Sequence, residues 1–129
     1  MSTELEPRTF RITREDLVAY AAASGDQNPI HQDDEVARSV GLPGVIAHGM
    51  YTLALAARAA DTWAGAPGRV VELGAKFTKP VVVPAGDDGV EVVVAGVVKK
   101  VDDGLTTVGM TVTCGDDKVL GMPTAVLRG

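Results

Sequence analysis

The sequence has a single cysteine, few aromatic side chains and no excess of basic residues. Cys114 has no second cysteine with which to form an internal disulfide, and this fits a reducing compartment. The formal net charge of −5 at pH 7 predicts no nucleic-acid partner, because the chain contains no basic run to neutralise phosphates. Phe, Trp and Tyr together make up 4% of the residues, so the core must consist mainly of Val, Ala and Leu.

Long apolar segments are also missing. The longest apolar run, residues 50–64, is too short to span a membrane and contains Arg58 and Asp61. Residues 1–8 are polar and lack the apolar segment of a signal peptide, so we predict a cytoplasmic protein with no membrane span. The chain has no G-x-G-x-x-G and no P-loop, and we predict no cofactor.

The length and composition indicate one globular domain over residues 1–129, with 46% apolar and 22% charged residues. A short strand is predicted around residues 10–12, after a polar start that is loose or an edge. Thr13 then begins a helix that ends near residue 23, and a second short helix is predicted over 33–40. The third helix begins near residue 48 or 49 and runs to residue 64, and it is apolar almost all round, which predicts burial on most sides.

The second half of the chain alternates in the manner of strands. We predict strands over residues 70–77, 90–101, 105–114 and 119–127, separated by turns rich in Gly and Asp. The strand at 90–101 is apolar on both faces at its centre, which is typical of a central strand. Four strands in hairpin order indicate an antiparallel sheet. The fold class is therefore α+β, with the long helix in the concave face of the sheet.

Chemistry-bearing residues gather between the first two helices, in a segment that we do not expect to be regular structure. Pro29 removes an N–H donor and pushes Asn28 out of the helical region. A turn of this kind can direct Asp26 and His31 into one cavity, where a carboxylate and an imidazole hold a water and move two protons. Asn28 could orient one of them. The alternative is that Asp26 caps the turn and His31 is a satisfied polar residue.

Gly49, at the start of the apolar helix, is a second candidate. Unpaired N–H groups at a helix start suit an oxygen that gains negative charge, and glycine lets a ligand approach closely. The alternative is that Gly49 only permits tight packing. His48 can be a ligand, an acid or a structural hydrogen-bonding residue. We predict no metal site, because His31 and His48 have no third ligand at a recognisable spacing and Cys114 lies in a predicted strand.

The run S-G-D-Q-N-P-I-H at 24–31, followed by I-A-H-G-M at 46–50, resembles the MaoC-like dehydratases, also called R-specific enoyl-CoA hydratases. Within that family it is similar to the hydroxyacyl-ACP dehydratase subunits of actinobacterial mycolic-acid synthesis. A-K-F-T-K-P-V at 75–81 extends the resemblance to nearly the whole chain. It implies a hot-dog fold, an antiparallel sheet wrapped around helix 49–64, and subunits that pair edge to edge.

The resemblance also implies an activity, the reversible syn hydration of trans-2-enoyl thioesters to (3R)-3-hydroxyacyl thioesters of CoA or acyl carrier protein (ACP). The family's catalytic pair falls on Asp26 and His31, and its carbonyl-binding N–H falls on Gly49. We further expect three residues to bind substrate, namely Asn28, His48 and Tyr51. A serine that some members carry two turns into the long helix is replaced by alanines here, which affects pocket polarity and substrate range.

Two other functions compete with this one. A hot-dog thioesterase would use the same helix start but release free thiol, and a non-catalytic partner subunit of a dehydratase heterodimer would turn over nothing. Homodimer and heterodimer are equally compatible with the sequence. The carrier, CoA or ACP, calls for basic residues, and six are candidates: Arg58, Arg69, Lys76, Lys79, Lys99 and Lys100.

Overall fold

A computed structural model of the chain describes residues 4–86 and 88–128. The first half holds one strand and the helices: β1 (Glu4–Ile12), α1 (Arg14–Ser24), the 3₁₀ helix η1 (Pro29–His31), α2 (Asp34–Ser39) and α3 (Gly49–Ala64). The second half holds the other strands: β2 (Val70–Phe77), β3 (Val90–Asp102), β4 (Leu105–Cys114), β5 (Asp117–Lys118) and β6 (Leu120–Arg128).

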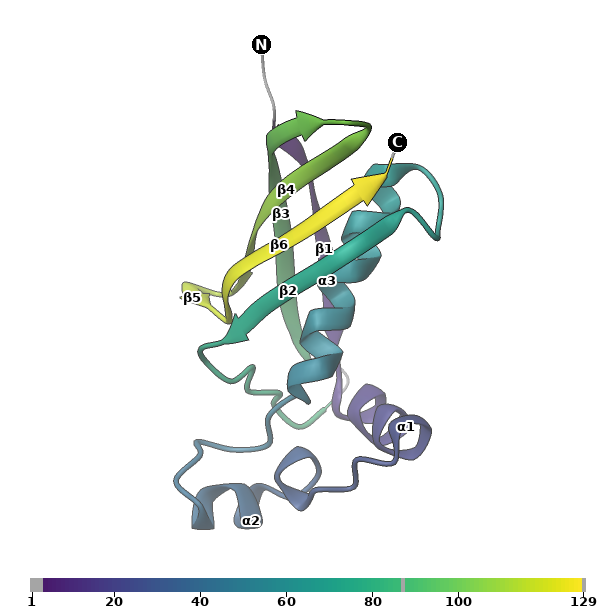
Figure 1. The fold of residues 1–129 in the computed structure, drawn as a ribbon. Coiled ribbons are helices and arrows are strands. Elements are labelled where there is room, and N and C mark those ends of the chain that lie inside the picture. The colour runs from purple at the N-terminus through teal and green to yellow at the C-terminus, as the bar shows by residue number, and fades with distance from the viewer. Residues whose placement is uncertain (1–3, 87, 129) are drawn as a thin grey trace.

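The strands form one antiparallel sheet in the order β1-β3-β4-β6-β2, with β5 paired to β4. The sheet curves around α3, and α1, η1 and α2 gather near the N-terminal end of that helix (Figure 1). The buried core is made mostly of Val, Ala and Leu, as the scarcity of aromatic residues predicts. The predicted α+β class with a helix against an antiparallel sheet is confirmed, and β3 is an interior strand between β1 and β4.

The order of the strands differs from the predicted succession of hairpins. β2 pairs with β6 and not with β3, which follows it in the sequence. The segment after β2 does not make a tight turn, because it runs past the end of the sheet and pairs with the stretch before α3 through an Ile46–Val82 bridge. β2 is therefore an edge strand, and its partner is the last strand of the chain.

Local signals predict the helix ends well. Thr13 and Asp16 form a reciprocal capping box at α1, and Gly25 ends that helix with a left-handed φ of 81°. Asp33 caps α2 by accepting hydrogen bonds from two backbone N–H groups. α3 begins at Gly49, as predicted, with His48 as its N-cap residue.

Two expectations about burial and regularity were wrong. α3 buries one face only, through Thr52, Leu55, Ala56, Ala59 and Ala60, whereas Met50 is 58% exposed. Pro29 begins a 3₁₀ turn and so lies in regular structure. It fits there because the first residue of a helix needs no N–H donor. β1 begins earlier than the strand predicted around residues 10–12, and it forms an edge of the sheet, which is one of the two expectations for the polar start.

No helix in the described part of the chain is long and apolar enough to cross a membrane.

Candidate active site

Three backbone segments meet at the N-terminal end of α3. The N–H of Ile46 donates to the carbonyl of Ile30 at 3.2 Å, which ties η1 to the stretch before α3. The N–H of Ala47 donates to the carbonyl of Val81 at 2.9 Å, which ties the same stretch to the segment after β2. The helix start is therefore enclosed by segments that are distant from one another in the sequence.

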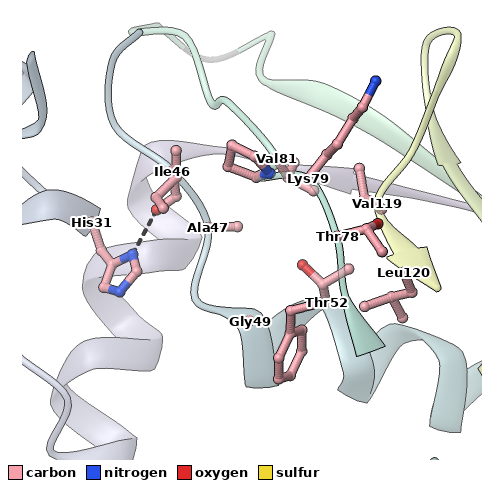
Figure 2. A pocket seen from close by; sticks show the side chains of 12 residues that line it. His31, Ile46, Ala47, Gly49, Thr52, Thr78, Lys79, Val81, Val119 and Leu120 are labelled. Carbon is pink, nitrogen blue, oxygen red and sulfur yellow. Dashed lines mark hydrogen bonds between the residues drawn. The ribbon is translucent and has the colours of Figure 1, made fainter. Parts of the chain in front are cut away.

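His31 faces this junction from η1 and is 7% exposed. Its Nδ1 lies 2.7 Å from the carbonyl oxygen of Ile46 (Figure 2). A carbonyl can only accept, so Nδ1 carries the hydrogen and the neutral ring has its bare acceptor at Nε2. The backbone thus selects the tautomer, and Nε2 is left to exchange a proton.

Asp26 lies on the exposed side of the same turn. Its Oδ1 accepts from the N–H of Asn28 at 3.2 Å, and Oδ1 of Asn28 accepts from the N–H of Ile30 at 3.2 Å. These two successive turns bring a carboxylate oxygen of Asp26 and a ring nitrogen of His31 within 4.8 Å. The structure therefore brings the predicted pair together, with a separation that a bridging water or a substrate hydroxyl can occupy.

His48 lies behind His31 and is 2% exposed. Its Nε2 donates to the backbone carbonyl of Asp26 at 3.1 Å, and its ring stacks on that of His31 with centroids 3.8 Å apart. Nδ1 of His48 is buried without a hydrogen-bond partner in the described part of the chain. The ring of Tyr20 packs between those of His48 and Tyr51, at 4.8 and 5.2 Å respectively. An aromatic layer thus supports the Asp26–His31 turn from inside.

Tyr51 belongs to this supporting layer and not to the cavity. Burial raises the pKa of its phenol above the ordinary value of 10.0, and the carboxylate of Asp16 raises it further. The phenol of Tyr51 is therefore protonated at neutral pH.

A cavity of about 260 Å³ opens beside His31 and the start of α3. Gly49 lies against the ring of Phe77, and a Cβ at Gly49 would be 3.1 Å from the nearest ring atom. Thr52, one turn into the helix, points into the cavity (Figure 2). The other walls come from the segment after β2 and from the start of β6: Thr78, Lys79, Pro80, Val81, Val119 and Leu120.

Of the predicted site residues, His31 and Gly49 line the cavity, and Asp26 lies at the His31 side. Asn28, His48 and Tyr51 do not line it, and the expectation that they bind substrate stays a prediction. Sequence reasoning missed Thr52, although a polar residue one turn into an apolar helix was a usable signal. It named Lys79 only among six basic residues, because nothing local places Lys79 at the site.

The reason for predicting no metal site needs correction. Asp26, His31 and His48 offer ligand atoms that all lie within 4.8 Å of one another, so a third possible ligand is near the two histidines. However, the two imidazoles stack with an interplanar angle of 23°. Their lone pairs therefore lie in two nearly parallel planes that are stacked 3.8 Å apart at the ring centres, and one metal ion about 2 Å from both nitrogens cannot lie in both planes. As they are stacked here, His31 and His48 are poorly arranged to bind one metal ion together.

An antiparallel sheet that wraps one long helix defines a hot-dog protein, and in this one Asp26 and His31 lie beside the start of that helix. Residues 2–116 match the family model of the MaoC like domain, and the chain belongs to this family. The resemblance carried by residues 24–31 and 46–50 is thereby confirmed.

Similar proteins and solved structures agree with this membership. Over 76 residues the chain is 45% identical to 3-hydroxyacyl-thioester dehydratase X of Mycobacterium tuberculosis, which covers 59% of this chain and 26% of the relative. A solved MaoC-like dehydratase has a TM-score of 0.94 at 37% identity, covering 98% of this chain and 39% of that one. An unliganded R-hydratase from Pseudomonas aeruginosa has a TM-score of 0.81 at 27% identity, covering 98% and 80%. The match thus spans about a quarter of the curated relative's length.

Proposed function

We propose that this protein is a hydro-lyase that interconverts trans-2-enoyl and (3R)-3-hydroxyacyl thioesters by syn hydration and dehydration. The observation that carries the proposal is the meeting of Asp26, His31 and the Gly49 backbone at one end of α3, beside a largely apolar cavity. The name of the M. tuberculosis relative, a 3-hydroxyacyl-thioester dehydratase, supports the same reaction class.

In the dehydration direction, the pair removes the proton from C2 of the substrate, and the electron pair of that bond moves toward the thioester oxygen. The electrons then return to form the C2–C3 double bond. The C3–O bond breaks with its electrons on oxygen, and the departing hydroxyl takes a proton and leaves as water. Asp26 and His31 handle both proton transfers as one coupled unit, with Nε2 of His31 as the ring's exchangeable site.

The helix start stabilises the charge that develops on the thioester oxygen. The N–H groups of Tyr51 and Thr52 both donate to the carbonyl of His48, whereas the N–H of Gly49 has no partner in the described residues. That N–H carries part of the positive end of the helix dipole. A donor of this kind contributes roughly 10²–10³-fold to the rate in other enzymes.

We propose that Asn28 and His48 hold Asp26 and His31 in position, whereas the sequence predicts that they bind substrate. Asn28 holds the turn through its side-chain and backbone hydrogen bonds, and His48 holds the carbonyl of Asp26 and the ring of His31. Both side chains then act by positioning the pair. Tyr51 packs behind them through Tyr20.

Lys79 is the one of the six basic candidates that lines the cavity. Its Nζ lies 3.2 Å from Oδ1 of Asp117, and both side chains are 59% exposed. An exposed ion pair of this kind exchanges readily with water and with other anions. We assign Lys79 to the phosphate of the thioester carrier, which CoA and ACP share. The partner is a second hot-dog subunit, either a copy of this chain or a different one.

The direct test is to mix the protein with crotonyl-CoA and with longer trans-2-enoyl-CoAs and to follow the loss of enoyl absorbance. We expect hydration to a product of R configuration. Release of free thiol would identify a thioesterase instead. No turnover from a folded dimer, with CoA or ACP substrates, would contradict an independent enzyme and favour a partner subunit, which native mass analysis of co-purifying chains would identify.

A further inference from the structure

We infer that the hydroxyl of Thr52 is the second donor to the thioester oxygen, beside the N–H of Gly49. This inference rests on the proposed function and extends it to a residue that the sequence motifs do not include. Thr52 is a nearly buried residue whose hydroxyl makes no hydrogen bond with the described residues and opens onto the cavity.

Thr52 is 4% exposed, yet its hydroxyl makes no hydrogen bond with any of the described residues. A helical threonine ordinarily donates to the carbonyl four residues earlier, which satisfies the hydroxyl. Thr62 does so in the same helix, where its Oγ1 donates to the carbonyl of Arg58 at 3.1 Å. For Thr52 the corresponding carbonyl, that of His48, is already occupied by the N–H groups of Tyr51 and Thr52.

The free hydroxyl faces the cavity. Thr52 is among the lining residues together with His31 and Gly49, and its side chain points into the cavity in Figure 2. Helical side chains lean toward the N-terminus of their helix and lie over residues three and four positions earlier. The side chain of Thr52 therefore lies on the same face of α3 as Gly49, three residues before it, whose N–H has no partner in the described part of the chain. Among the described residues only Nδ1 of His48 is a fully buried side-chain polar atom without a partner, so the hydroxyl of Thr52 is open to a water or a ligand in the cavity.

The proposed chemistry supplies that ligand. The enolate oxygen formed when C2 loses its proton has room for two or three hydrogen bonds, and the Gly49 N–H fills one. Thr52 can donate its O–H to the same oxygen without changing its own protonation state. No further bond forms or breaks, because the hydroxyl only stabilises charge. Thr52 thus becomes a substrate-contacting catalytic residue.

The test compares Thr52→Val, Thr52→Ser and Thr62→Val in the hydration of crotonyl-CoA. Valine has nearly the shape of threonine and lacks the hydroxyl, so we expect Thr52→Val to stay folded and to lose roughly 100-fold in kcat with little change in KM. Thr52→Ser should recover most of that loss. Thr62→Val, which removes a satisfied hydroxyl from the same helix, is the matched control and should keep wild-type kinetics.

A second measurement uses acetoacetyl-CoA, whose enolate absorbs in the near ultraviolet and resembles the charged state. We expect wild type to raise the bound enolate fraction and Thr52→Val to lose at least about 10-fold in enolate affinity. Thr52→Val with wild-type kcat and wild-type enolate binding would overturn the role of Thr52 while leaving the enzyme assignment intact. If the wild type is inactive as a hydratase but binds the enolate through Thr52, the proposed hydro-lyase activity is refuted and the role of Thr52 stands. If the wild type is inactive and does not bind the enolate, the proposed activity and the role of Thr52 are both refuted.

Discussion

At the scale of single residues, the two members of the proposed catalytic pair differ in their surroundings. Asp26 is exposed on a turn, whereas His31 is buried and donates through Nδ1 to the carbonyl of Ile46. Substitutions that test the pair should keep these hydrogen bonds, because removing the whole His31 ring would leave a cavity and an unpaired backbone carbonyl. Amide side chains preserve the local hydrogen bonds of both residues and remove only their proton chemistry.

We therefore expect Asp26→Asn and His31→Asn each to stay folded and to lose at least about 100-fold in kcat for enoyl-CoA hydration. The asparagine at 26 keeps an oxygen for the N–H of Asn28, and the asparagine at 31 keeps a donor for the carbonyl of Ile46. Circular dichroism and thermal unfolding check the fold, and a coupled absorbance assay checks the rate. Asp33→Asn, at the cap of α2, serves as a control, and wild-type turnover in either site variant would refute the pair.

At the scale of elements, Asp34 joins the helices to the loops that frame the cavity. Its carboxylate accepts from the N–H of Val45 at 2.9 Å and from the guanidinium of Arg14 at 2.9 and 3.0 Å. Arg14 also donates through Nε to the carbonyl of Val83 at 2.8 Å. The starts of α1 and α2 and the stretches around residues 45 and 83 are thereby held in one arrangement, which keeps His31 opposite the start of α3.

These contacts predict a pH dependence of stability. The Val45 hydrogen bond first, and then the one from Arg14, lower the pKa of Asp34 from its ordinary value of 3.8. A carboxyl with a lowered folded-state pKa stabilises the fold above its unfolded-state pKa, and the stabilisation is lost as the pH falls through the folded-state pKa.

Asp34→Asn should therefore be less stable than wild type at pH 7, and the difference should shrink as the pH falls below about 4. Urea unfolding at a series of pH values measures this difference. Asp102→Asn, in an exposed ion pair with Lys100 at 3.7 Å, is the control with little expected effect. A difference between Asp34→Asn and wild type that is independent of pH would show that the charge of Asp34 contributes nothing.

At the scale of the whole molecule, the described sheet has two open edges, β1 and β2. β2 carries two large exposed apolar residues, Val71 at 46% and Phe77 at 58%, and Phe77 also covers Gly49 at the cavity. An open edge with apolar side chains favours pairing with another strand. The family resemblance implies edge-to-edge pairing, and β2 is the edge next to the site.

We expect the chain alone to have twice the monomer mass by light scattering, or to reach a comparable mass with a second hot-dog subunit. Val71→Lys should weaken that association, because an edge lysine opposes strand pairing. Val101→Lys, which replaces another exposed valine, at 69% exposure on the interior strand β3, is the control and should leave the mass unchanged. A monomeric wild-type protein with full hydratase activity would contradict the proposed partner.

Much of the local structure depends only on residues that are close together in the sequence. Hydrogen bonds and side-chain patterns within a few positions determine the ends of α1, α2 and α3, the turn that joins Asp26 to His31, and the alternation along the strands. The sequence alone therefore predicts these features. Other features join segments that are far apart in the chain: the pairing of β2 with β6, the stacking of His48 on His31, and the cavity that Thr52 and Lys79 both line. Only the tertiary structure decides such contacts, because any apolar strand can pair with several others and only packing around α3 selects one arrangement.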